Sequence, residues 1–446
     1  MLSLPNHQKP LFLREPKGFL PENDALGTYG IYLEEFNRLL AGKNFLTSEA
    51  SHSIMNGGAY DAVRSFIPLN IRRNYGIFFT SAALADKLAA YCGTQISQKS
   101  IIIDPACGAG ELLLAAARKL PLQKDLATTI KHWGKNLYGF DLHSELVHTT
   151  KVRLLILAAI RCKEPILDPG LIAYLKNIKQ GNALENLSVI STADIVLMNP
   201  PFSQIIAHKD CDWATGKVTY AAVFLDSVLS SLKSNASLYC ILPEVIRCGT
   251  RYKKLQERIK HISDLTIEES VGIFDAWTDI DVYIAGFSKA KTLKKKPIPV
   301  QNTANIKVLD FFDIRVGPVV PYRDPHLGIN HFYLDVESLP RWSNGFQTKK
   351  KRKYKGTVFN GPFVAIRRTS RPGDQFRAVA TVIGKHSAAV AVENHLIVAL
   401  PKDGKITTCR RLIKVLRNPL TSNFLDEFMR CRHLTVSSIK NIPWVE

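Results

Sequence analysis

The sequence predicts an α/β protein with two folded parts: a doubly wound, mostly parallel sheet over residues 71–290 and a separate basic, β-rich domain over residues 301–446. Short β-rich runs alternate with helix-like segments in the first part, as in successive βαβ units. In the second part, short apolar runs between 358 and 400 precede a helical end at 412–429. A lysine- and proline-containing linker is expected at 291–300, and a helical or irregular lead-in at 1–70.

The elements of the first part follow one another in a regular order. Strands are expected at residues 101–103, 137–140, 195–198, 238–242 and 282–287, and helices at 111–119, 145–160 and 220–232. Strands that alternate with helices in this way imply parallel neighbours in one sheet.

The charge of the chain is concentrated near its end. Lys plus Arg number 59 against 39 Asp plus Glu, a formal charge of +20. Residues 286–446 alone hold 29 Lys plus Arg and 11 Asp plus Glu, which accounts for roughly +18 of it. Such a density of cations suits a polyanion, because each neutralised phosphate releases counterions. Nucleic acid is therefore the expected partner, with a solvated basic face as the alternative.

Composition excludes several other classes of protein. With 46% hydrophobic and 22% charged residues, the chain is not mostly disordered or fibrous. It contains no apolar run near the roughly 18 residues that cross a bilayer, and its start lacks the features of a secretory signal. The eight cysteines form no CxxC pair. We expect a cytoplasmic protein with reduced thiols, no membrane partner and no metal.

The most informative segment is the turn after the first expected strand, Asp104-Pro105-Ala106-Cys107-Gly108-Ala109-Gly110. Glycines between a strand and a helix let the backbone approach a ligand closely at the carboxyl edge of a parallel sheet. A nucleotide-like cofactor is expected there. Asp141, at the end of the next strand, can accept hydrogen bonds from both ribose hydroxyls. Its alternative role is a helix N-cap.

A third strand runs into Asn199-Pro200-Pro201-Phe202. The two prolines donate no backbone hydrogen bonds, so the carbonyls at this strand tip are held free and fixed. The Asn199 amide oxygen and the Pro200 carbonyl can together bind both hydrogens of a planar amine, and Phe202 offers a ring for stacking a base.

Together these motifs resemble the S-adenosylmethionine-dependent DNA methyltransferases that act on the exocyclic amine of adenine. The resemblance covers about residues 74–290 and implies a Rossmann-like methyltransferase sheet. It implies that the methyl donor is bound by Phe79, Thr80, Asp104, Pro105, Ala106, Gly108, Gly110, Asp141, Asn182 and Phe224. The implied catalytic segment is Asn199 to Phe202, with Phe202 and Phe274 stacking the target base; Trp277 is the alternative to Phe274.

The resemblance also implies an activity and partners. An adenine would rotate out of double-stranded DNA, and its N6 amine would attack the methyl group while Asn199 and Pro200 accept its hydrogens. The basic domain would act as a target-recognition domain, with DNA contacts from Lys351, Arg352, Lys353, Arg367, Arg368 and Arg371. A restriction-modification system with a cognate endonuclease is the implied setting.

Two positions depart from the family pattern, and two other interpretations stay open. The usual Thr-Pro is Thr80-Ser81 here, and the usual acidic residue of the adenine-reading turn is Asn182. An RNA methyltransferase acting on adenine or guanine amines shares the planar-amine chemistry. A catalytically weak DNA-binding subunit of a modification complex would explain the departures.

Overall fold

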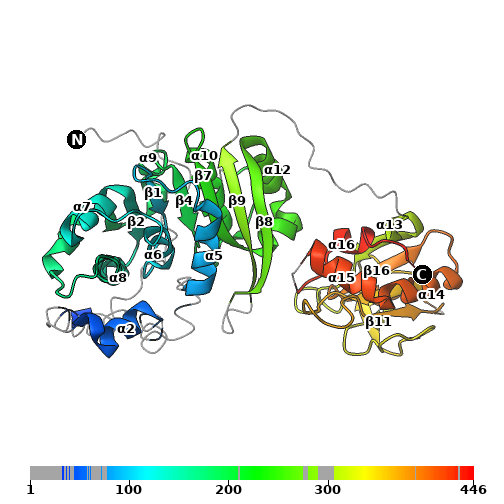
Figure 1. Cartoon of the computed structure of the whole chain (residues 1–446). Helices are drawn as coiled ribbons and strands as arrows, with labels where there is room; N and C mark the ends of the chain where they lie inside the picture. Colours follow the sequence, from blue (N-terminus) through cyan, green and yellow to red (C-terminus); the bar gives the residue numbers. More distant parts are fainter. Residues whose placement is uncertain are drawn as a thin grey trace. The chain divides into compact units, whose positions relative to one another are not determined.

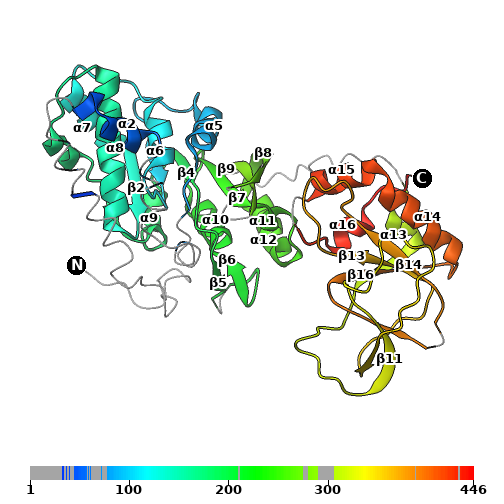
Figure 2. The ribbon, with the colours of Figure 1, turned by 90° about the horizontal axis from the view of Figure 1, so that it is seen from below.

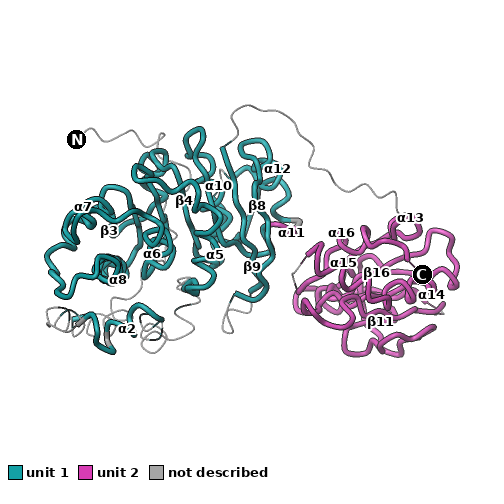
Figure 3. Tube along the Cα trace, viewed as in Figure 1, with its two compact units in different colours: residues 1–246, 251–294 teal, residues 247–250, 295–446 magenta. Residues whose placement is uncertain are grey.

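The computed structural model describes residues 45–57, 78–208, 211–274, 280–289, 306–386, 388–429 and 432–445, with single positions at 33, 34, 37, 40, 59, 61 and 72. Most of the expected lead-in, the expected linker at 291–300 and Trp277 lie outside these residues. The chain divides into two compact units (Figure 3). Unit 1 comprises Met1–Ile246 and Arg251–Lys294, and unit 2 comprises Arg247–Thr250 and Lys295–Glu446.

Unit 1 is built on a seven-stranded sheet in the order β3-β2-β1-β4-β7-β9-β8 (Figure 1). Its strands are β1 (Ile102–Asp104), β2 (Leu137–Asp141), β3 (Ile178–Gln180), β4 (Ile195–Met198), β7 (Ser237–Pro243), β8 (Ser263–Ile273) and β9 (Asp281–Lys289). The first five strands in this order form four parallel pairs, and β9 is antiparallel to both β7 and β8. The expected mostly parallel α/β sheet is confirmed.

Helices connect and cover these strands (Figure 2). They are α5 (Ala82–Cys92), α6 (Glu111–Ala117), α7 (Leu126–Asn136), α8 (Ser144–Cys162), α9 (Leu187–Ile190), α10 (Tyr220–Ser231), α11 (Glu244–Cys248) and α12 (Lys253–Ile262). Helix α6 packs on β1 and β4, α8 on β2 and β3, and α10 on β7. A short lead-in helix, α2 (Glu49–Met55), contacts α8.

The strand order reverses direction between β1 and β4, since the chain proceeds outward from β1 to β3 and then returns to the other side of β1. In open α/β sheets ligands bind at the carboxyl ends of the strands beside such a switch point. The segments that follow β1, β2, β3 and β4 therefore meet at one edge. After β4, a two-stranded hairpin of β5 (Gln204–Ile206) and β6 (Lys217–Thr219) precedes α10.

Unit 2 is rich in β-structure, as expected. A four-stranded antiparallel sheet has the order β10-β16-β13-β14: β10 (Phe312–Val316), β16 (Leu396–Pro401), β13 (Phe363–Arg367) and β14 (Ala380–Ile383). A three-stranded sheet has the order β12-β11-β15: β12 (Lys351–Tyr354), β11 (Ile329–Leu334) and β15 (Val390–Val392). Helices α13 (Val308–Phe311), α14 (Ile406–Arg417), α15 (Pro419–Phe428) and α16 (Val436–Lys440) complete the unit. Helix α14 packs on β13, β14 and β16.

Strand β8 was not predicted, and its position explains why. It pairs on one side only, with β9, and most of its eleven residues are at least partly exposed. An exposed edge strand lacks the continuous apolar run that marks a buried parallel strand. Among the described residues, no helix is long and apolar enough to cross a membrane.

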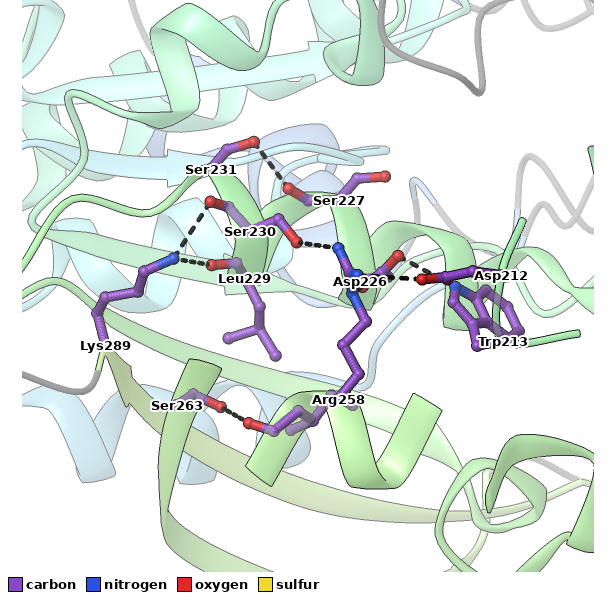
Figure 4. A network of polar contacts seen from close by, with 11 residues as sticks. Asp212, Trp213, Asp226, Ser227, Leu229, Ser230, Ser231, Arg258, Ser263 and Lys289 are labelled. Carbon is purple, nitrogen blue, oxygen red and sulfur yellow. Dashed lines mark hydrogen bonds and ion pairs between the residues drawn. The ribbon is translucent and has the colours of Figure 1, made fainter. Parts of the chain in front are cut away.

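A buried carboxylate ties three segments of unit 1 together (Figure 4). Asp226 of α10 is 3% exposed, and it accepts hydrogen bonds from Trp213 Nε1 at 3.0 Å and from Arg258 Nε at 2.7 Å. Arg258 belongs to α12, so the carboxylate links α10, α12 and the loop after the β5 strand. The exposed Asp212 carboxylate lies farther from the same guanidinium, at 3.5 Å.

We expect Asp226→Ala to lower the free energy of unfolding by about 2–3 kcal/mol, because the buried Trp213 Nε1–H and the Arg258 Nε–H both lose their acceptor. Asp212→Ala is the matched control, with an expected loss of at most about 0.5 kcal/mol, since an exposed ion pair contributes little. Urea unfolding of both variants measures the difference, and equal losses would contradict the role given to Asp226.

Candidate functional site

The carboxyl ends of the parallel strands surround an open cavity. A smaller compartment adjoins it and shares several lining residues with it, among them Gly108 and Asn199. Nine residues of the predicted site line the larger cavity: Phe79, Pro105, Ala106, Gly108, Asp141, Asn182, Asn199, Pro201 and Phe224. Thr80 and Asp104 line the smaller one. The glycine turn and the asparagine-proline tip thus share one cleft.

The turn after β1 is supported by α8. Gly108 and Gly110 have φ of +51° and +90°, and a Cβ on Gly110 would lie 2.7 Å from Thr150 Cγ2. Thr150 Oγ1 donates to the Gly108 carbonyl at 2.8 Å, and Arg153 Nη1 donates to the Ala109 carbonyl at 2.7 Å. Glycine is therefore required at 110 both by backbone conformation and by the close approach of α8.

A buried ion pair supports the same turn. Arg153 Nη2 lies 2.7 Å from Glu111 Oε2, and the two side chains are 0% and 4% exposed. Glu111 is the first residue of α6. No sequence motif marks Thr150 or Arg153, because both lie in a helix whose role is visible only once it packs against the turn.

Asp104 ends β1 and is almost fully buried, with 1% exposure. Its Oδ1 accepts the Ala106 N–H at 3.0 Å. Burial raises the pKa of this carboxyl to about 8, and the backbone hydrogen bond from Ala106 opposes that rise. The group lines the smaller compartment, where a cationic ligand would favour its ionised form.

Asp141 ends β2 with both carboxylate oxygens turned to backbone donors at the cavity edge. Gly108 N–H donates to Oδ2 at 3.0 Å and His143 N–H donates to Oδ1 at 2.9 Å. Burial raises the pKa of this carboxyl, whereas His143 and the two N–H groups lower it. A carboxylate oxygen accepts two hydrogen bonds, so each oxygen retains a site for a ligand hydroxyl.

The turn after β3 forms the far wall of the cavity. Asn182 Oδ1 accepts the Leu184 N–H at 3.0 Å, which caps a single helical turn, and Asn182 Nδ2 donates to Glu185 Oε1 at 3.3 Å. The Tyr220 ring contacts Phe224 edge to face, with centroids 5.0 Å apart. Burial raises the pKa of Tyr220 to about 12. Tyr220 lines the cavity beside the predicted Phe224, although no sequence motif had indicated it.

The asparagine tip after β4 is oriented by one side chain. Asn199 Nδ2 donates to Thr80 Oγ1 at 2.9 Å, and Thr80 is 5% exposed. The Asn199 Oδ1 atom is buried and has no hydrogen-bond partner in the described structure. An unpaired buried acceptor is costly, so its retention at a cavity wall points to a ligand donor. Ser81, the departure from Thr-Pro, accepts the Leu84 N–H as N-cap of α5.

The aromatic ring of Phe202 lies beyond the tip and outside the two cavities. Its ring contacts Phe274 edge to face, with centroids 5.3 Å apart and planes at 75°. The Phe202 carbonyl accepts from Thr219 Oγ1 at 3.2 Å, which anchors the segment to the start of α10. Phe274 therefore lies beside Phe202. The two rings are in contact and leave no room for a base between them.

The six basic residues predicted to contact DNA fall into two groups. Arg352, Arg367 and Arg368 donate to backbone carbonyls of unit 2, at Asp324, Leu339 and Asn394 among others. Lys351, Lys353 and Arg371 are exposed. The exposed group is the one whose charges are available to a polyanion. Among the described residues, no cluster of His, Cys, Asp or Glu could hold a metal ion.

Residues 56–238 match the family described as N-6 DNA Methylase. The structure of the Type IIL restriction-modification enzyme MmeI, solved in complex with DNA, shares 11% identity with a TM-score of 0.51, covering 86% of this chain and 70% of that one. A modification subunit from Vibrio vulnificus YJ016 shares 18% identity over 54% of this chain with a TM-score of 0.37. The M protein of the type I restriction enzyme EcoKI shares 15% identity over 62%, also with a TM-score of 0.37.

The likeness to MmeI concerns the fold alone. The chain spans 50% of the Vibrio vulnificus subunit and 59% of the EcoKI M protein. A comparison with curated protein sequences found no match.

The raised pKa of Asp104 predicts a pH dependence of stability. Its native pKa, about 8, lies above its ordinary value of 3.8, so between these values the native state binds more protons than the unfolded state. The contribution of Asp104 to folding stability therefore falls as the pH rises from about 4 to 8. We expect Asp104→Asn, which keeps the acceptor for Ala106, to lose less stability over this range than the wild type. Urea unfolding at pH 5.5 and 8 tests this, and parallel pH profiles would contradict it.

Proposed function

We propose, because residues 56–238 belong to the N-6 DNA methylase family, that the chain transfers a methyl group from S-adenosylmethionine to the N6 amine of an adenine flipped out of double-stranded DNA. The observation that carries the proposal is the buried, unpartnered Oδ1 of Asn199, which Thr80 holds at the cavity shared with the glycine turn. An acceptor in that place suits the amine of a planar base.

The residues around the cavity fit the methyl donor. Asp141 offers a carboxylate to ribose hydroxyls, and Tyr220 with Phe224 offers aromatic surface beside the turn of Asn182. The Gly108 turn allows close approach of the backbone, and Asp104 offers a carboxyl to a cationic amino group. S-adenosylmethionine, when bound, supplies an electrophilic methyl group on a sulfonium centre.

The residues of the tip act on the amine. An adenine amine is a weak nucleophile because its lone pair is delocalised into the ring. Hydrogen bonds from its N–H groups to Asn199 Oδ1 and to the Pro200 carbonyl favour a pyramidal nitrogen and localise that lone pair. The proton leaves to water after transfer, so the chain needs no dedicated general base. Catalysis is then mainly positioning.

Thr80 acts as a positioning residue in this mechanism. A primary amide has a donor end and an acceptor end, and only the acceptor end can receive an amine hydrogen. Because Thr80 Oγ1 receives the Asn199 Nδ2 hydrogen, the amide presents Oδ1 to the amine. The sequence resemblance assigned Thr80 to the methyl donor, and its hydrogen bond adds this second role.

The target base would stack on Phe202. In the structure Phe274 packs against that ring, so entry of a base requires Phe274 to move aside. The basic unit 2 would grip the DNA backbone through its exposed cations. A restriction-modification setting, with a cognate endonuclease as partner, follows from the family.

The proposed function is tested by expressing the chain in a host that lacks DNA methylation and mapping modified adenines by polymerase-kinetics sequencing. The wild type should modify adenines within a fixed sequence. Asn199→Ala should modify none, while the purified variant still binds S-adenosylmethionine. Gln204→Ala, an exposed change just beyond the tip, is the control and should retain activity. Unmodified DNA from the wild type, or ordinary activity of Asn199→Ala, would refute the proposal.

Thr80→Val removes the acceptor for Asn199 Nδ2 and frees the amide to rotate. We expect kcat to fall about 10- to 100-fold with little change in the KM for S-adenosylmethionine, because the loss concerns geometry in the reacting complex. Thr80→Ser restores the hydroxyl and should restore most of kcat. A raised KM with unchanged kcat would indicate that Thr80 contacts only the methyl donor.

A further inference from the structure

Strands β11 and β12 belong to a three-stranded sheet, but β15 pairs with β11 only at Phe332–Leu334. Residues 329–331 and 352–354 therefore extend beyond β15 as a two-stranded ribbon, and its two faces differ in character. Directly opposite residues in an antiparallel pair share a face. Asn330 lies opposite Lys353, and Phe332 lies opposite Lys351, so these four side chains share one face. Lys351 Nζ lies 5.5 Å from the centroid of the Phe332 ring, consistent with that assignment. Asn330, Lys351 and Lys353 are exposed.

The opposite face of the ribbon is structural. Arg352 is 6% exposed, donates to the Asp324 carbonyl at 2.6 Å and lies 5.5 Å from the centroid of the Tyr333 ring. Its guanidinium thereby fastens the 321–324 turn to β12. Within the Lys349–Lys355 run, Arg352 thus serves the fold of unit 2, whereas its two neighbours point away from it.

The ammonium groups of Lys351 and Lys353 lack internal partners, whereas the Phe332 ring on the same face packs against a hydrophobic cluster of unit 2. Lys350 is neutralised by Asp335, at 2.7 Å. Lys351 and Lys353 form no ion pair with any carboxylate of the described chain. Strand β12 is at the edge of its sheet, and Figure 2 shows β11 on the side of unit 2 away from α15. Lys351 and Lys353 therefore lie on an edge strand of the sheet.

Exposed apolar side chains gather beside the same ribbon. Tyr322, Leu327 and Ile329 are 88%, 55% and 72% exposed, and all lie within eight residues. Exposed apolar groups next to unpaired cations are a feature of interaction surfaces. The excess of cations in this part of the chain selects a polyanion as the occupant.

We infer that the β11–β12 ribbon enters the major groove of duplex DNA and reads base edges with Asn330 and Lys353. The inference rests on the proposed DNA substrate and names the element that selects the sequence. The major groove, about 12 Å wide, admits a two-stranded ribbon. An asparagine amide pairs with the adenine edge, and a lysine ammonium pairs with guanine. Lys351 contacts a phosphate at the groove wall.

The contribution of Lys351 and Lys353 to DNA binding is tested by measuring the affinity of the full chain for DNA. The probe is a random-sequence 30-base-pair duplex, titrated over a range of salt without methyl donor. The double variant Lys351→Ala/Lys353→Ala should make the dependence of log affinity on log salt shallower by about 0.9, because the phosphate that Lys351 contacts is no longer neutralised. Lys405→Ala/Lys414→Ala removes the same charge from the exposed start and surface of α14 and should change the slope much less. Equal effects of the two double variants would overturn the inference.

The base preference assigned to Asn330 is tested by selecting bound sequences. Duplexes bound from a random library are sequenced for the wild type and for Asn330→Ala. The variant should keep its affinity for random duplex within about twofold but lose the base preference at one or two adjacent positions. An unchanged selected sequence, or no selection by the wild type, would overturn the inference.

The results of these experiments can refute the role of the ribbon and the proposed methyl transfer independently of each other. A wild-type chain that binds duplex but transfers no methyl group would refute the proposed activity, while the variants would still decide the role of the ribbon. A wild-type chain that binds no duplex would overturn both.

Discussion

The hydrogen bond from the Asn199 amide to the Thr80 hydroxyl determines which end of that amide faces the cavity. Everything proposed for the chemistry depends on it, because a rotated amide would present donors to an amine that is itself a donor. The bond joins two segments that are far apart in sequence. This hydrogen bond forms only when the segment before α5 lies over the end of β4. The fold of unit 1 thus brings an acceptor and its orienting group together.

The surrounding structure supports this arrangement through several contacts. Helix α8 supports the glycine turn through Thr150 and the buried Arg153–Glu111 pair, and Thr219 anchors the backbone after the tip. A group that acts by position gains from such support, since small displacements of a reacting geometry are costly. The unpaired Asn199 Oδ1 and the high pKa of Asp104 show that polar atoms are retained at this edge despite the cost of burial.

The sequence predicted the parts of the fold and site that short motifs carry. Short runs of aliphatic and aromatic residues marked β1, β2 and β4, and the residues at their ends, Asp104, Asp141 and Asn199, line the two adjoining compartments. Edge strand β8 was missed because most of its residues are exposed. Tyr220 and the supporting residues of α8 were missed because nothing local distinguishes them from ordinary helix residues. The basic run was recognised by charge alone, which could not separate the buried Arg352 from the exposed Lys351 and Lys353.

The most direct test of the central claim is transfer of a labelled methyl group. The purified chain is incubated with S-adenosylmethionine labelled on its methyl group and with DNA or RNA of matched sequence, and the nucleosides are analysed by mass spectrometry. If Asn199 Oδ1 receives an adenine amine, the label appears as N6-methyl-2′-deoxyadenosine from the DNA. Label in RNA, label on another base, or no transfer despite bound methyl donor would contradict the account.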